Sequence, residues 1–166
     1  MSYSIEALRP EDWPQVRAIY VEGISTGTAT FETDVPDWDE WDRSHLPHSR
    51  LMARTDEGQL AGWAALSPVS DRCAYGGVAE VSVYVGAASR GQGLGKALLD
   101  ALVRESEAAG VWTLQAGMFA QNPASIALHE NCGFRVVGVR ERLGALRGVW
   151  HDVVLMERRS PTVGAD

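Results

Sequence analysis

The chain has 166 residues, of which 45% are hydrophobic and 22% charged, and its formal net charge is −7 at pH 7. This length predicts one domain with a buried core, and an acidic chain without a basic stripe is not expected to bind nucleic acid. No apolar run is long enough to span a membrane, so no membrane partner is expected. The two cysteines, Cys73 and Cys132, lack paired spacing, and the N-terminus lacks signal-peptide features, which favours a cytoplasmic protein.

The pattern of apolar and turn-forming residues predicts alternating strands and helices. The expected strands cover residues 4–8, 51–55, 60–66, 79–85, 112–118, 135–140 and 149–156. The expected helices run from Pro10 to about Gly23, over a short stretch at 36–41, from a glycine-rich loop ending at 96 to about 109, and over 122–133. This order predicts an α/β (α+β) domain in which helices cover both faces of a mixed sheet. The domain is expected to end near residue 159, and residues 160–166 to form a flexible tail.

The glycine-rich loop joins the strand at 79–85 to the next helix. It reads Arg90-Gly91-Gln92-Gly93-Leu94-Gly95-Lys96, and the strand before it ends in Val83-Tyr84-Val85. The first N–H groups of a helix have no internal partner and carry partial positive charge, and glycine lets the backbone approach an anion closely. Arg90 and Lys96 add full positive charge at the two ends. The loop therefore predicts a diphosphate-binding site.

The glycine spacing separates this loop from other phosphate-binding loops. It does not match the Gly-x-x-x-x-Gly-Lys-Ser/Thr pattern of nucleotide hydrolases. A dinucleotide-binding Gly-x-Gly-x-x-Gly pattern would need glycine at the position of Leu98. The pattern present is Arg-x-x-Gly-x-Gly over 90–95, and it resembles the loop that holds the pyrophosphate of coenzyme A in GCN5-related N-acetyltransferases (GNAT).

Further motifs extend this resemblance over nearly the whole chain, to about residue 157. One is Asn122-x-x-Ser125-x-x-Leu128-His129, with Gly133-Phe134 after it. More narrowly, the chain resembles the phosphinothricin N-acetyltransferase group through Thr28-Ala29-Thr30-Phe31, Arg72-x-x-Tyr75, Glu80-x-Ser82-Val83-Tyr84-Val85, Leu128-His129-Glu130 and Trp150-His151-Asp152-Val153. The resemblance implies a single N-acetyltransferase domain over 1–159. Its GNAT fold is a twisted, mixed, mostly antiparallel sheet of about six to seven strands flanked by about four helices.

The resemblance also implies acetyl-CoA as co-substrate and a homodimer as the assembly. Enzymes of this group acetylate the α-amino group of phosphinothricin, methionine sulfoximine, methionine sulfone or arsenic-containing analogues. Two other functions fit the same motifs: acetylation of another amine or of a protein N-terminus, and a coenzyme A-binding sensor without catalysis. Glu80 and His129 favour an enzyme, because a pure binder does not need them.

Glu80 is the candidate general base, since an ammonium group must lose a proton before it attacks a thioester. The alternative for Glu80 is an exposed or ion-paired glutamate. His129 stands where many GNAT enzymes carry tyrosine, and it can relay a proton, bind the cofactor or simply bond to nearby backbone. The strand edge at 83–85 is expected to bind pantetheine and to polarise the thioester carbonyl. Asn122 and Ser125 are expected to bind the cofactor or to cap their helix.

Arg72 and Tyr75 are the candidates for recognising the acceptor, because a planar guanidinium matches a carboxylate well. Phe31 is expected to close the acceptor pocket, from the same or a neighbouring subunit, and Glu80 to contact the acceptor. Relatives that act on methionine derivatives often carry arginine just after the aromatic residue, where this chain has Gly76-Gly77. The acceptor is therefore less predictable than the acetyl donor.

Two histidine-containing motifs favour structural roles. His45-x-x-His48 lacks neighbouring acidic or thiol ligands, so no metal site is expected there or elsewhere. Trp150-His151-Asp152 could suggest a catalytic histidine–aspartate pair, but adjacent strand residues point to opposite faces. These residues are expected to form the last strand and, by the resemblance, part of a dimer surface.

Overall fold

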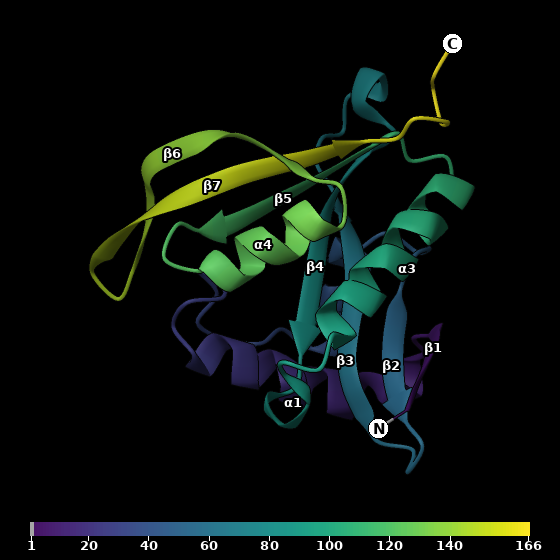
Figure 1. Cartoon of the computed structure of the whole chain (residues 1–166). Helices are drawn as coiled ribbons and strands as arrows, with labels where there is room; N and C mark the ends of the chain where they lie inside the picture. Colours follow the sequence, from purple (N-terminus) through teal and green to yellow (C-terminus); the bar gives the residue numbers. More distant parts are fainter. Residues whose placement is uncertain (1) are drawn as a thin grey trace.

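The computed structural model describes residues 2–166 and contains a seven-stranded sheet with helices on both faces (Figure 1). The strands are β1 (Tyr3–Ala7), β2 (Leu51–Thr55), β3 (Leu60–Pro68), β4 (Val78–Val85), β5 (Thr113–Phe119), β6 (Arg135–Leu146) and β7 (Val149–Arg159). Their order in the sheet is β1-β2-β3-β4-β5-β7-β6. All neighbours are antiparallel except β4 and β5, which are parallel. The mixed, mostly antiparallel sheet expected from the sequence is confirmed.

The helices lie where the sequence predicts them. Within residues 2–166 they are α1 (Trp13–Ser25), α2 (Trp38–Ser44), α3 (Leu94–Ala108) and α4 (Pro123–Asn131), with short 3-10 turns η1 (Pro10–Asp12), η2 (Cys73–Tyr75) and η3 (Ala87–Ser89). Gly93 precedes α3 with a φ of 79°, and Gly110 follows it with a φ of 86°. Both conformations lie in the left-handed region that glycine adopts without strain. Pro123 occupies the first position of α4, where its missing N–H costs no hydrogen bond.

The strand β6 is longer than the sequence predicts, since it ends at Leu146 rather than near residue 140. It pairs with β7 up to Leu146 and Val149, and a tight turn at Arg147 and Gly148 joins the two strands. The pairing register shifts between Arg140 and Gly144. This irregularity interrupts the alternation of apolar residues, so the pattern hides the second half of the strand.

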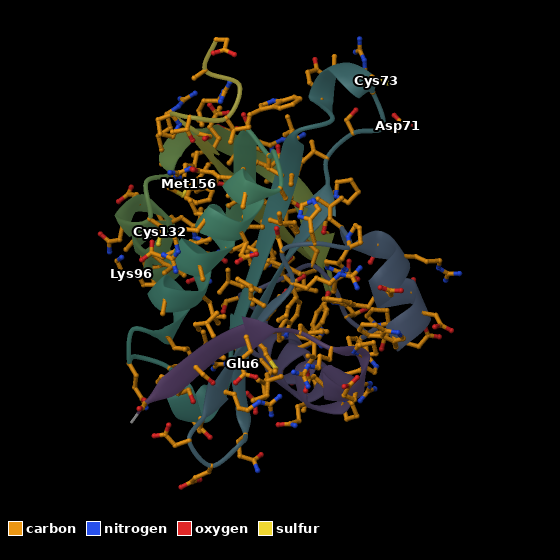
Figure 2. The ribbon with its side chains drawn as sticks, turned by 90° about the vertical axis from the view of Figure 1, so that its right-hand side faces the viewer. Glu6, Asp71, Cys73, Lys96, Cys132 and Met156 are labelled. Atoms are coloured by element: carbon orange, nitrogen blue, oxygen red, sulfur yellow. The ribbon has the colours of Figure 1, made fainter. Side chains whose placement is uncertain are left out.

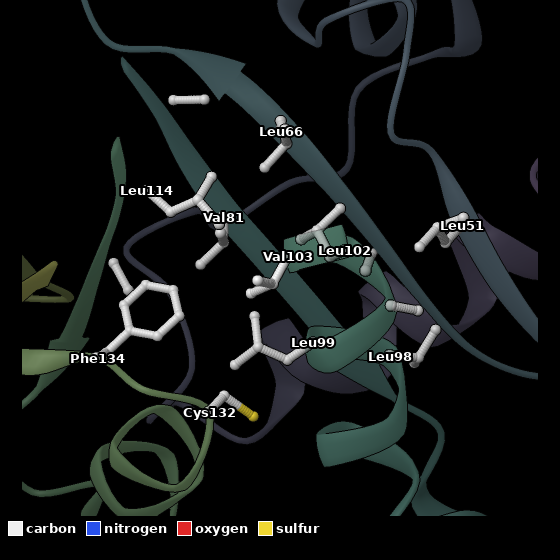
Figure 3. Close-up of a cluster of buried hydrophobic side chains, with 14 of the residues drawn as sticks. Leu51, Leu66, Val81, Leu98, Leu99, Leu102, Val103, Leu114, Cys132 and Phe134 are labelled. Atoms are coloured by element: carbon white, nitrogen blue, oxygen red, sulfur yellow. The ribbon is translucent and has the colours of Figure 1, made fainter. Parts of the chain in front are cut away.

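Each face of the sheet carries its own buried core. The apolar side of α3 packs on one face, where Leu98, Leu99 and Leu102 meet residues of β3, β4 and β5 (Figure 3). These leucines follow the helical spacing that places them on one side of α3. On the opposite face α1 and α2 bury Trp41 and Trp63 together with other aromatic side chains. The sheet is therefore covered on both sides, as its sequence predicts.

The parallel neighbours β4 and β5 separate partway along their length. Only three positions pair, and the last is Glu80 with Gln115. Beyond this point β4 continues to Val85, while β5 continues to Phe119 and remains paired with β7. The two strands diverge in Figure 1, with α4 beside the opening. The edge of β4 that faces β5 is therefore without a strand partner beyond Glu80, within the described residues.

The segment after β7 makes several hydrogen bonds. The N–H of Ser160 donates to the carbonyl oxygen of Trp112 at 2.7 Å, and the Arg159 guanidinium donates to the carbonyl oxygens of Val163 and Gly164. The flexibility expected for residues 160–166 stays a prediction. None of the helices within residues 2–166 is both long enough and apolar enough to cross a membrane.

Candidate functional site

The divergence of β4 and β5 opens a cleft of about 380 Å³, which we call the fork cleft. Its lining comes from both strands, from β6 and β7, from the irregular segment between α1 and α2, and from α4 and the residue before it. The lining includes Ala29, Thr30, Phe31, Glu32, Glu80, Val81, Ser82, Val83, Tyr84, Met118, Phe119, Asn122, Ser125, His129 and Leu143. The cleft therefore brings together Phe31, Glu80 and His129, three site residues predicted from distant parts of the sequence.

A second cavity of about 390 Å³, the loop cavity, adjoins the fork cleft. It is lined by the glycine-rich loop, the end of β4, the segment after α1 and the start of α4. Ala29, Val83, Tyr84, Asn122 and Ser125 line both cavities, so a long ligand can run from the glycine-rich loop into the fork cleft.

The glycine-rich loop contains two glycines in the left-handed conformation. Gly91 and Gly93 have φ values of 74° and 79°, in the left-handed region, and both line the loop cavity with Arg90. The free N–H groups of the first turn of α3 lie directly after the loop. Arg90 donates from Nε to the carbonyl oxygen of Val85 at 3.2 Å, which holds its side chain against the end of β4.

Two residues predicted to bind the diphosphate have side chains engaged elsewhere. The Lys96 ammonium pairs with Asp100 at 2.6 Å, one turn further along α3, and Lys96 does not line the loop cavity. In Figure 2 Lys96 lies beside Cys132, on the flank of α3. The Gln92 amide oxygen accepts a hydrogen bond from the Tyr3 hydroxyl at 2.5 Å. The side chain of Gln92 thus links the loop to β1.

Glu80 occupies the point where the two strands part. Its carboxylate oxygen Oε1 accepts a hydrogen bond from the Gln115 side-chain amide at 3.1 Å, and the residue is half-buried. Glu80 forms no ion pair with any residue of the described chain. A half-buried carboxylate held by a neutral amide in the lining of a cleft is chemically able to accept a proton from an amine, and the general-base role of Glu80 stays a prediction.

His129 is buried in α4 and faces the fork cleft. Its Nδ1 lies 2.7 Å from the carbonyl oxygen of Ser125, and because a carbonyl only accepts, Nδ1 carries the hydrogen. Burial lowers the pKa of His129 below its usual value of 6.5, which favours the neutral ring. In that neutral form Nε2 carries a lone pair and can accept a proton.

Asn122 caps α4 and also joins two walls of the site. Its Oδ1 accepts a hydrogen bond from the N–H of Ser125 at 3.2 Å, so the capping role is confirmed. Its Nδ2 donates to the carbonyl oxygen of Thr28 at 3.4 Å. The start of α4 is therefore attached to the irregular segment that covers the cleft.

Phe31 lines the fork cleft of its own chain, and its role in closing the acceptor pocket stays a prediction. Its ring packs edge-on against Phe119 at a centroid distance of 4.6 Å and lies 6.1 Å from the ring of His151. A side chain at Gly144 would come within 3.1 Å of the Phe31 ring, so this glycine leaves space for it. Phe119 was not predicted as a site residue, although it ends a strand that the sequence identifies.

Arg72 and Tyr75 lie apart from the cleft lining. Both belong to the connection between β3 and β4, where the Arg72 guanidinium lies 5.4 Å from the centre of the Tyr75 ring. Both side chains are exposed, and neither lines the fork cleft. Figure 2 shows the neighbouring residues Asp71 and Cys73 in a turn that projects from one end of the molecule. The acceptor-binding role of Arg72 and Tyr75 stays a prediction.

A comparison of the sequence with protein families identifies the family of this chain. The model of the acetyltransferase (GNAT) family matches residues 7–134, more than half of the chain. The chain belongs to the GNAT acetyltransferase family and is an N-acetyltransferase.

Within this family the chain resembles the phosphinothricin and methionine sulfoximine acetyltransferases. It is 36% identical over 164 residues to phosphinothricin N-acetyltransferase of Alcaligenes faecalis, covering 93% of this chain and 81% of that protein. It is 32% identical over 162 residues to L-methionine sulfoximine/L-methionine sulfone acetyltransferase of Pseudomonas aeruginosa, covering 95% of this chain and 94% of that protein. The crystal structure of a GNAT superfamily phosphinothricin acetyltransferase from Sinorhizobium meliloti in complex with AcCoA superposes with a TM-score of 0.89. That match has 29% identity and covers 100% of this chain and 92% of the other.

Proposed function

We propose that the chain transfers an acetyl group from acetyl-CoA to the α-amino group of a small amino acid analogue. The class is that of phosphinothricin, methionine sulfoximine and methionine sulfone, including arsenic-containing analogues. The observation that carries this proposal is the continuity between the loop cavity and the fork cleft, whose lining contains Glu80 and His129. The names of the similar enzymes from Alcaligenes faecalis and Pseudomonas aeruginosa support the acceptor class.

The loop cavity suits the diphosphate and pantetheine of the donor. The N–H groups of the loop and of the first turn of α3 hold the diphosphate, and Arg90 adds charge. The unpaired edge of β4 at Val83 to Val85 lies along the path toward the fork cleft. Its backbone groups are available to bond the pantetheine and to stabilise negative charge that develops on the thioester oxygen.

The transfer then needs a base and a route for protons. Glu80 takes a proton from the acceptor ammonium, directly or through a water, which frees the nitrogen lone pair. The nitrogen attacks the carbonyl carbon, the new C–N bond forms, and the C–S bond breaks. The nitrogen gives up a second proton and the sulfur takes one, so the products are the amide, the free thiol and one released proton.

His129 can carry the second proton. Its Nδ1 is occupied by the Ser125 carbonyl, so the lone pair on Nε2 is the position that accepts the proton from the nitrogen. The same Nε2 then protonates the departing sulfur. In this scheme Glu80 deprotonates the ammonium and His129 protonates the leaving sulfur. The two residues line the cleft from different elements, β4 and α4.

We also propose that the chain forms a homodimer through the β6–β7 hairpin. This hairpin exposes a group of large apolar side chains: Val136, Val137, Val139, Leu143, Val149 and Trp150. Trp150 is 61% exposed, and Leu143 also lines the fork cleft. Large exposed apolar side chains gathered on one hairpin are a feature of protein–protein contact surfaces. Sedimentation of the wild type against Trp150→Glu tests the proposal, and a monomeric wild type would contradict it.

A thiol-release assay with acetyl-CoA tests the proposed activity. The acceptors are phosphinothricin, methionine sulfoximine, methionine sulfone, ordinary amino acids, diamines and short peptides with a free N-terminus. Turnover of the amino acid analogues supports the proposal, and turnover of peptides alone would reassign the acceptor. Binding of acetyl-CoA without any turnover would favour a sensor. In the same assay Arg72→Ala should raise the acceptor KM without changing acetyl-CoA affinity if Arg72 contacts the acceptor.

A further inference from the structure

Glu80 and Gln115 form the last paired position of β4 and β5 before the two strands diverge (Figure 1). Their side chains meet at this position, because Gln115 Nε2 donates a hydrogen bond to Glu80 Oε1 at 3.1 Å. The side chains of Glu80 and Gln115 therefore join the two strands at the point where the backbone pairing ends.

The Glu80 carboxylate depends on this one contact. Within residues 2–166, no other side chain forms a hydrogen bond or an ion pair with it. On the other side of β4 the paired residue is Ser67 of β3, and its hydroxyl does not bond to the carboxylate. A glutamate side chain has several rotatable bonds, and ordering it costs conformational entropy. The amide of Gln115 is the group that restricts the direction of this carboxylate.

The hydrogen bond leaves one carboxylate oxygen of Glu80 available to a ligand. Oε1 accepts from Gln115, whereas Oε2 has no donor among the described residues. Glu80 lines the fork cleft, while Gln115 lines neither the fork cleft nor the loop cavity. Gln115 thus contacts the carboxylate without bordering the space for either substrate.

The neighbour of Gln115 on its other side explains why the amide bonds to Glu80. The residue paired with Gln115 on β7 is Glu157, and its carboxylate forms an ion pair with Arg135. Glu157 is therefore engaged with a cation, and the Gln115 amide donates to Glu80.

The amide group suits a carboxylate that must take up a proton. A lysine or arginine at this position would bring a positive charge beside Glu80, and a nearby opposite charge favours the ionised carboxylate over the protonated one. A neutral amide holds the carboxylate without bringing that charge. Gln115 therefore combines an orienting contact with little opposition to protonation.

On the basis of the proposed acetyl transfer, with Glu80 as general base, we propose that Gln115 is a positioning residue for the reaction. Its amide holds Oε1 of Glu80 and directs Oε2 toward the ammonium group of the acceptor. Because Gln115 lines neither substrate cavity, it acts only through Glu80. Its loss should slow proton removal and leave the binding of acetyl-CoA unchanged.

The first test replaces the amide by a thioether of similar length. With methionine sulfone as acceptor in the thiol-release assay, Gln115→Met should lower kcat by about tenfold, the effect of losing one hydrogen bond to a charged group. The KM for acetyl-CoA should not change. Gln59→Met is the matched control, because it makes the same chemical change in the exposed turn between β2 and β3, and it should leave kcat unchanged. Gln115→Asn withdraws the amide by one methylene, should also lower kcat, and replaces the methionine variant if that variant does not fold.

A double-mutant cycle separates positioning of the base from a general structural role. In a Glu80→Gln background the base is absent, so Gln115→Met should lower kcat no further. A merely structural contribution of Gln115 would lower kcat in both backgrounds. An equal loss in the two backgrounds would therefore overturn the positioning role, as would an unchanged kcat of both Gln115 variants.

The outcomes also distinguish this inference from the proposed function. A low kcat of Glu80→Gln together with wild-type kcat in Gln115→Met would keep the proposed function and overturn the role of Gln115. Bound acetyl-CoA without turnover of any acceptor by the wild type would overturn the proposed function, and the role of Gln115 with it. A loss of kcat in Gln115→Met that disappears in the Glu80→Gln background would support both.

Discussion

Gly23 gives a sharp test of how the core fixes the cleft. It lies in the last turns of α1, and a Cβ added to it would come within 2.7 Å of two ring carbons of Tyr84. That ring cannot move away easily, since it stacks on Trp63 at 4.8 Å and on Tyr20 at 4.9 Å. Overpacking of this kind costs about 1–3 kcal/mol, whereas replacing glycine by alanine in a helix gains about 0.5–1 kcal/mol. Taking the middle of each range, Gly23→Ala should therefore lower the free energy of unfolding by about 1 kcal/mol.

Urea unfolding of four variants measures this effect. In a Tyr84→Val background the ring is absent, so Gly23→Ala should change sign and stabilise the chain by about 0.5–1 kcal/mol. Gly95→Ala is the matched control in α3, because its Cβ would lie 3.4 Å from the nearest Leu128 carbon, an ordinary contact. A Gly23→Ala variant as stable as the wild type would refute the reasoning, as would a cost that persists in the Tyr84→Val background.

Three further predictions concern the site. Glu80→Gln should lower kcat by about 100-fold or more if this carboxylate is the general base, and an unchanged kcat in the thiol-release assay would exclude that role. Arg90→Ala should raise the KM for acetyl-CoA more than Lys96→Ala, because the Lys96 ammonium is already paired with Asp100; equal effects would contradict this. The pKa of the His129 ring is lower in the folded chain than in the unfolded chain, so the unfolded chain binds a proton at this ring more readily. The contribution of neutral His129 to the free energy of unfolding is therefore complete above about pH 6.5 and is lost as the pH falls below that value. The thermal midpoint of His129→Gln should accordingly fall less than that of the wild type between pH 7 and 5, and parallel curves would argue otherwise.

The fold was largely predictable because its elements follow local rules. The spacing of Leu98, Leu99 and Leu102 predicts the buried side of α3, and glycines in left-handed conformations mark both of its ends. The end of β6 was not predictable, since its second half is paired only through the hairpin with β7, and the register shift before Gly144 breaks the alternation. Such pairing depends on a partner strand rather than on the local sequence.

The site was predictable to the extent that it depends on backbone conformation. The glycine-rich loop, the capping role of Asn122 and the convergence of Glu80 with His129 follow from motifs. Side-chain direction did not follow from the loop motif: Lys96 pairs with Asp100 one turn along α3, a pair that their four-residue spacing on a helix allows. The cavity that Asp34 and Glu40 share with Tyr84 was missed for a similar reason: these two residues come from a loop and a short helix whose position relative to β4 is set by tertiary packing.

The strand β4 contributes to the core with one face, to a cavity with the other face and to an open edge, because its pairing with β5 stops at Glu80. Along β4, Val81, Val83 and Val85 face the core under α3, while Glu80 and Tyr84 face the opposite side of the sheet, as the alternation of a strand requires. The backbone edge of a strand normally forms hydrogen bonds with a neighbouring strand, which for this edge of β4 would be β5. Here the divergence leaves that edge open toward the two cavities, so its backbone groups form no hydrogen bonds with β5 there. Extending the β4–β5 pairing beyond Glu80 and Gln115 would close the cleft without changing a single side chain in it.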